Sequence, residues 1–128
     1  MIHLLLKLEK NSKCFYGIKA IGNWDTPGLV RAIPSCIEGS DYRVTIETAS
    51  LFLISAIYYE DLKFADPPIL CEFSVEEKSC DEVGNTPQRI MKAWRSTKNW
   101  NKLLKNKGFS YLSKKGLGPL INSGLTFF

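Results

Sequence analysis

Apolar and polar positions alternate along much of the first 75 residues, and the alternation predicts β-strands. Residues 2–8 place an isoleucine and three leucines at every second position, so these side chains would share one face of a strand. Residues 14–21, after a turn-forming Asn-Ser-Lys, are expected to complete a hairpin with them. Residues 42–48 alternate most regularly and predict a half-exposed strand.

Two further segments extend the predicted sheet. Residues 51–59 are apolar throughout, which fits either a buried helix or a central strand, and their aromatic and β-branched side chains favour the strand. Residues 69–75 alternate again. Ile69, Cys71, Phe73 and Val75 are expected to point inward, and Leu70, Glu72 and Ser74 outward. Because most of these strands have no room for a crossover helix between them, we expect a largely antiparallel sheet.

The C-terminal third changes to a helical pattern. Thr86 is a good N-cap, Pro87 suits the first helical position, and Gly108 is a natural stop, so the sequence predicts a helix over 87–107. At 100° per residue the segment has two faces. The apolar face contains Ile90, Ala93, Trp94, Thr97, Trp100, Asn101 and Leu104, and the opposite face contains Arg95, Lys98, Lys102 and Lys105, with Lys92 at its margin.

Together these patterns predict one α+β domain over residues 1–128. Its mainly antiparallel sheet has four to six strands, including a short one at 125–128, and packs against the helix at 87–107. The length of 128 residues is that of one ordinary domain, and 45% hydrophobic with 23% charged residues is a globular composition. Disordered and collagen-like classes do not fit.

The longest apolar run, residues 49–59, is about half of what a bilayer crossing needs. The first residues have no basic leader, and Lys7 and Glu9 interrupt their apolar stretch, so we expect no signal peptide and a cytoplasmic protein. The four cysteines (Cys14, Cys36, Cys71 and Cys80) form no close pair of the zinc or redox type. The spacing leaves two disulfides open, but buried free thiols are the favoured interpretation.

Charge is divided sharply along the chain. Residues 1–84 contain thirteen acids and eight bases, a net −5, whereas residues 85–128 contain nine bases and no acid, a net +9. The overall net charge of +4 therefore conceals two opposed blocks. The acids are densest over residues 60–82, which hold eight acids against two lysines, a local −6.

This division has two interpretations. In one, the acidic and basic blocks are ordinary solvated faces that partly neutralise each other. In the other, one block steers and docks a charged partner. The acidic candidates for partner binding are Glu60, Asp61, Asp66, Glu72, Glu76, Glu77, Asp81 and Glu82, and the basic candidates for a phosphate backbone are Arg95, Lys98, Lys102 and Lys105.

No pattern in the chain predicts a catalytic or metal site. His3 is the one histidine, and a surface or packing role suits it best. The glycines form no phosphate-binding loop, no serine lies in a nucleophile elbow, and the acids at 76–82 do not follow a calcium-loop spacing. We therefore expect no enzyme activity, no metal and no cofactor.

The tryptophans have structural and functional interpretations. Trp94 and Trp100 lie on or beside the apolar arc of the predicted helix and are expected in the core. Trp24, within Gly-Asn-Trp-Asp-Thr-Pro-Gly, is expected on a loop, where it would serve either as an interface anchor or as a cap on the core. Basic and aromatic residues also interleave over 92–111, as on a surface for single-stranded nucleic acid.

A small α+β protein with free cysteines, polarised charge and no catalytic motif resembles bacterial immunity proteins, in particular those paired with contact-dependent growth-inhibition toxins. The resemblance implies a protein that binds a cognate toxin domain, often a nuclease, and occludes its active site. The net charge of +4 departs from the acidic balance of a nuclease inhibitor, although the acidic block at 60–82 would supply a local patch. The alternative is a small nucleic-acid-binding module that uses the basic helix face.

Overall fold

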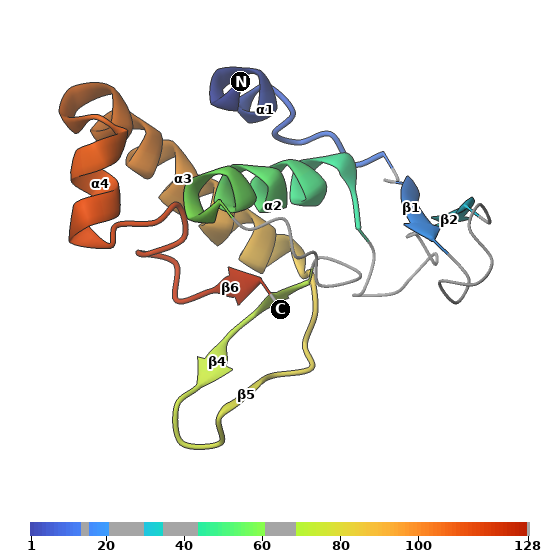
Figure 1. The fold of residues 1–128 in the computed structure, drawn as a ribbon. Helices are drawn as coiled ribbons and strands as arrows, with labels where there is room; N and C mark the ends of the chain where they lie inside the picture. The colour runs from blue at the N-terminus through green and yellow to red at the C-terminus, as the bar shows by residue number, and fades with distance from the viewer. Residues whose placement is uncertain (14–15, 21–29, 35–43, 61–68, 128) are drawn as a thin grey trace.

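The computed structural model describes residues 1–13, 16–20, 30–34, 44–60 and 69–127 (Figure 1). The described residues form four helices, α1 (Ile2–Leu6), α2 (Ile46–Tyr59), α3 (Pro87–Lys107) and α4 (Phe109–Lys115). They also form six short strands, β1 (Tyr16–Ala20), β2 (Val30–Pro34), β3 (Leu70–Cys71), β4 (Phe73–Ser74), β5 (Ser79–Cys80) and β6 (Thr126–Phe127). The predicted mixture of helix and antiparallel strand is therefore correct.

The predicted sheet of four to six strands is wrong for the described residues. The strands pair only two by two, as β1 with β2, β3 with β6 and β4 with β5, and every pair is antiparallel. Residues 16–20 do form a strand, but it pairs with β2 and not with residues 2–8. The short final strand is present at Thr126–Phe127.

Two segments expected to be strands are helical in part, and a third, residues 51–59, lies entirely within α2. Residues 2–8 contain leucines at consecutive as well as alternate positions, so the pattern satisfies a helix equally, and Ile2, Leu5 and Leu6 of α1 pack against the core. The strand predicted over 42–48 instead contains the start of α2, where Thr45 accepts a hydrogen bond from the backbone N–H of Thr48. Its first two residues lie outside the described part.

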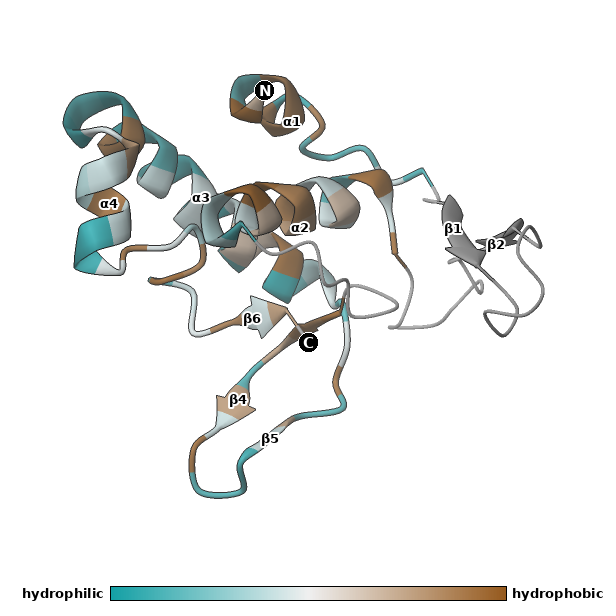
Figure 2. Ribbon diagram, in the orientation of Figure 1, coloured by the Kyte–Doolittle hydropathy of each residue, from teal (hydrophilic) through white to brown (hydrophobic). Residues whose placement is uncertain are grey.

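The helix α2 is buried on most of its circumference, which explains why its sequence has no amphipathic period. Nine of its fourteen residues are buried. A helix surrounded by protein needs no polar face, so its apolar run resembles a central strand. Figure 2 shows brown, apolar bands along α2, whereas the end of α3 that leads into α4 is mostly teal, that is, hydrophilic.

The prediction for α3 is confirmed in its bounds, its N-cap and its two faces. The Thr86 side chain accepts a hydrogen bond from the N–H of Arg89, Pro87 opens the helix, and Gly108 ends it with a φ of +83°. All seven residues of the predicted apolar face are buried or half-buried, and the predicted basic residues are exposed. α4, which follows directly, was not predicted.

Two clusters of buried side chains join the helices to the C-terminal segment. Leu51 of α2 packs with Leu70, Ala93, Trp94, Leu120 and Leu125 in the first cluster. In the second, Ile54 and Tyr58 of α2 pack with Trp100 and Leu112. The core thus lies between α2 and α3 and is closed by residues 117–127.

Candidate functional site

A hairpin built from β4 and β5 projects away from the helices (Figure 1). Phe73 pairs with Cys80 and Ser74 with Ser79, and the turn between them places Lys78 in the left-handed region at a φ of +51°. The Ser74 side chain accepts a hydrogen bond from the N–H of Glu77 at 3.1 Å. The single strand predicted over 69–75 is therefore divided into β3 and β4, and residue 75 belongs to the turn.

The inward and outward faces predicted for residues 69–75 are also partly wrong. Leu70, expected to point outward, is fully buried, whereas Phe73 is 54% and Val75 80% exposed. The physical reason is that β3 pairs with β6 at the core and β4 pairs with β5 outside it. Glu72 separates the two short strands. A single pattern of alternating inward and outward side chains therefore does not continue from β3 into β4.

A disulfide closes the base of the hairpin. Cys71 and Cys80 are joined with their Cα atoms 5.5 Å apart, and Cys71 is buried. The prediction of free thiols is therefore wrong for this pair. The hairpin pairs Cys80 with Phe73 and so returns it close to Cys71, nine residues earlier in the sequence. Cys14 and Cys36 lie outside the described residues.

An ion pair ties the same base to α3. The buried Arg89 guanidinium donates from both of its terminal nitrogens to the two carboxylate oxygens of Asp81, and Nη1 also approaches the Leu70 carbonyl oxygen at 3.4 Å. These hydrogen bonds hold the pKa of Asp81 below its usual value and raise the pKa of Arg89. Asp81, which was predicted to contact a partner, therefore forms an ion pair with Arg89 of the same chain.

The Asp81 pair predicts an acid-sensitive stability. Because the pKa of Asp81 is lower in the folded than in the unfolded chain, the ionised carboxylate stabilises the fold above pH of about 4, and this contribution is lost as the pH falls through the folded pKa. We expect Asp81→Asn to flatten the acid limb of a plot of unfolding free energy against pH. Arg89→Gln should flatten it equally, since it removes the same partner. Urea unfolding at pH 2.5–7 measures this, and an Asp81→Asn profile parallel to that of the unmodified chain would contradict it.

The exposed part of the hairpin combines acidic and apolar side chains. Residues 72–82 contain five acids and one lysine, a net charge of −4. Glu72, Glu76, Glu77 and Glu82 are exposed, as are Phe73 and Val75. The structure therefore brings together five of the eight predicted acids, counting Asp81, on one projecting element.

The remaining predicted partner-binding residues are not placed on the hairpin. Glu60 is exposed at the C-terminal end of α2, where it adopts a left-handed conformation with a φ of +52°. Asp61, Asp66 and Trp24 lie outside the described residues.

The predicted basic face is present along α3. Arg95, Lys98, Lys102 and Lys105 are all exposed. The Lys98 ammonium, however, lies 2.9 Å from the Glu9 carboxylate beyond α1, so one of the four charges is partly neutralised within the chain. Exposed pairs of this kind add little stability.

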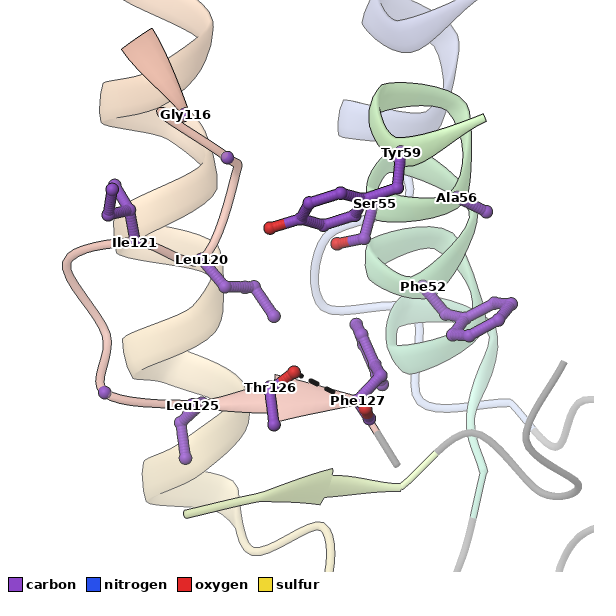
Figure 3. A pocket seen from close by; sticks show the side chains of 12 residues that line it. Phe52, Ser55, Ala56, Tyr59, Gly116, Leu120, Ile121, Leu125, Thr126 and Phe127 are labelled. Carbon is purple, nitrogen blue, oxygen red and sulfur yellow. Dashed lines mark hydrogen bonds between the residues drawn. The ribbon is translucent and has the colours of Figure 1, made fainter. Parts of the chain in front are cut away.

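A hollow between α2 and residues 116–127 was not predicted. Its volume is about 420 Å³. The side chains of Ser55 and Tyr59 point from α2 toward Leu120 across it (Figure 3), and Phe52 packs edge to face against Phe127. The segment Gly116-Leu-Gly-Pro-Leu contributes to its lining. The spacing of glycines in a sequence, however, does not predict a cavity. Only the tertiary arrangement of α2 against the C-terminal segment creates it.

Across 1–13, 16–20, 30–34, 44–60 and 69–127, no three histidine, cysteine or acidic side chains gather as metal ligands would. No helix in these ranges combines the length and apolar character needed to cross a bilayer. His3 is exposed on α1.

Comparison with protein-family models, curated proteins and solved structures gave no match to this chain.

Proposed function

We propose that this chain is an inhibitory binding protein of the immunity type, which neutralises a toxin domain by inserting the 71–82 hairpin into a basic, phosphate-binding cleft. The observation that supports the proposal is a projecting hairpin that is fixed at its base and exposed at its tip. The disulfide and the Arg89–Asp81 pair hold the base, while acidic and apolar side chains remain outside.

A fixed, projecting hairpin suits inhibition for a physical reason. A loop that is already in its bound conformation loses little conformational entropy on binding, so more of the contact energy appears as affinity. The cross-link between Cys71 and Cys80 restricts the hairpin in this way. Exposed Phe73 and Val75 supply apolar area for the centre of an interface, and the surrounding carboxylates supply a polar rim.

The charge of the hairpin suits a nuclease. An enzyme that binds a phosphate backbone lines its cleft with lysine and arginine, which would attract a hairpin with a net charge of −4. Electrostatic attraction of this kind raises association rates by about 10- to 1,000-fold. The inhibitor would then block the cleft sterically, with no chemical step of its own.

Charge reversal at the tip tests the proposal. Glu76→Lys together with Glu77→Lys changes the hairpin charge by four units without touching Asp81 or the disulfide. The assay expresses the C-terminal region of the reading frame immediately upstream of this gene, with and without the chain. We expect that region to arrest growth, the unmodified chain to restore growth, and the reversed chain to associate with it at least about 10-fold more slowly at low salt.

A matched control reverses two lysines on the basic face. Lys102→Glu with Lys105→Glu changes the charge by the same amount in the opposite direction and should leave protection intact. If the α3 control loses protection while the hairpin variant keeps it, the hairpin is not the docking site. An upstream product that is harmless would contradict the immunity function, and retention on RNA that weakens with salt and depends on Lys102 and Lys105 would favour the nucleic-acid-binding alternative.

A further inference from the structure

Beyond the proposed inhibitory role, we infer that the hollow between α2 and residues 116–127 is a binding site for a small uncharged molecule. The molecule would be largely apolar and carry one hydrogen-bonding group, as a phenol does. Figure 3 shows the site from close by, with α2 on one side and the C-terminal segment on the other.

The size and lining of the hollow define the ligand class. A volume of about 420 Å³ lies within the range of small-molecule sites in proteins. Aromatic and aliphatic side chains from both walls line it, among them Phe52, Leu120 and Leu125, and none of its described lining residues is charged. An ionic ligand would lose its hydration without gaining a partner, which favours a neutral one.

The Ser55 hydroxyl provides the polar contact. Ser55 is 7% exposed, and no described residue supplies a hydrogen-bond partner for its Oγ. Ser50, one and a half turns earlier on the same helix, instead donates to the Ile46 carbonyl at 2.7 Å. Burying a hydroxyl without a partner is unfavourable, because the hydrogen bonds that it would make to water are lost. In Figure 3 the Ser55 hydroxyl points from α2 into the hollow, where a ligand would satisfy it.

Tyr59 forms one rim of the same site. It lies one turn after Ser55 on α2, and its hydroxyl points toward the C-terminal segment in the same direction (Figure 3). The ring lies so close to Gly118 that a Cβ at that position would be 2.5 Å from the tyrosine oxygen. Gly118 therefore permits an arrangement in which the Ser55 and Tyr59 hydroxyls border the hollow beside aromatic and aliphatic side chains. The Thr126 hydroxyl, which also lines the hollow, donates to the Phe127 carbonyl at 3.4 Å.

The test compares two probes that differ by one hydroxyl. We would titrate the full chain with p-cresol and with toluene and follow backbone amide shifts by NMR. The expected result is saturable binding of both probes, with shifts concentrated at residues 116–127 and the second half of α2. Ser55→Ala should weaken p-cresol binding by about 5- to 10-fold and leave toluene binding unchanged, since only p-cresol uses the hydrogen bond.

Two further variants complete the design. Ile121→Trp places a large ring at an exposed position of the lining and should weaken both probes by at least about 10-fold. Ser50→Ala, on the same helix but outside the hollow, should change neither. Shifts that scatter over the surface without saturating, unchanged binding by Ile121→Trp, or an equal loss of both probes in Ser55→Ala would each overturn the inference. Growth protection by the chain is not part of this readout, so the two proposals fail separately.

Discussion

Trp100→Ala is expected to lower the free energy of unfolding by about 3–5 kcal/mol, the range for removing a buried aromatic side chain. Trp100 is 2% exposed in the second core cluster, between α2, α3 and α4. Its ring meets Tyr58 edge to face at a centroid distance of 5.8 Å, and its Nε1 donates to the Leu117 carbonyl at 2.8 Å. The substitution removes the packing and leaves that carbonyl without its donor.

Two variants on the same helix make the measurement specific. Trp100→Phe keeps most of the apolar volume and loses the hydrogen bond, so it should cost less than Trp100→Ala. Met91→Ala, at an exposed position of α3, should change stability by no more than about 0.5 kcal/mol. Urea denaturation followed by far-ultraviolet circular dichroism provides the values. A loss below about 1 kcal/mol for Trp100→Ala would show that the second cluster is not packed as described.

Removal of the hairpin cross-link is expected to cost about 2–3 kcal/mol. The bond between Cys71 and Cys80 closes a short loop. Closing a loop of this length lowers the conformational entropy of the unfolded chain, which destabilises the unfolded state by about this amount. The variant Cys71→Ala/Cys80→Ala keeps small apolar side chains at both positions. It should unfold at a lower urea concentration than the unmodified chain under oxidising conditions.

A reductant supplies the control for this pair. Reducing the unmodified chain should produce the same loss of stability, and the double variant should lose nothing further through this bond. Peptide mapping of the oxidised chain identifies the linked pair directly. If Cys71 and Cys80 are both labelled as free thiols in the oxidised, folded protein, the cross-link and its share of the hairpin's rigidity are refuted.

The sequence predicted α3 well because half of its surface is exposed. A helix between core and solvent must alternate apolar and charged positions with its own period, and Ala93, Trp94 and Lys98 follow that period. α2 has no such constraint, since residues such as Leu51, Ile54 and Ser55 are buried on several sides. The preference for a strand over residues 51–59 was therefore wrong, and the other interpretation, a buried helix, is the one found.

Of the candidate sites, the acidic hairpin was partly predictable from the sequence, whereas the Arg89–Asp81 pair and the hollow were not. The sequence could single out several acids that the structure gathers on the hairpin, because charge is carried by the residues themselves. Their role in binding a partner stays a prediction. Arg89 was missed as a partner of Asp81, since the pairing depends on the hairpin base meeting the first turn of α3. The hollow was missed for the same reason: its walls come from residues 52–59 and 116–127, which only the tertiary fold brings together.

The pairing of β3 with β6 has a consequence for how the chain folds during synthesis. Leu70 and Phe127 are partners across more than fifty intervening residues, and Leu120 and Leu125 belong to the same core cluster as Leu51. Contacts between such distant residues form late, because a long segment must first be ordered. A ribosome-bound chain can form α2 and α3 early, yet their shared apolar surfaces stay uncovered until residues 117–127 emerge. Over that interval the nascent chain is most exposed to aggregation and to capture by chaperones.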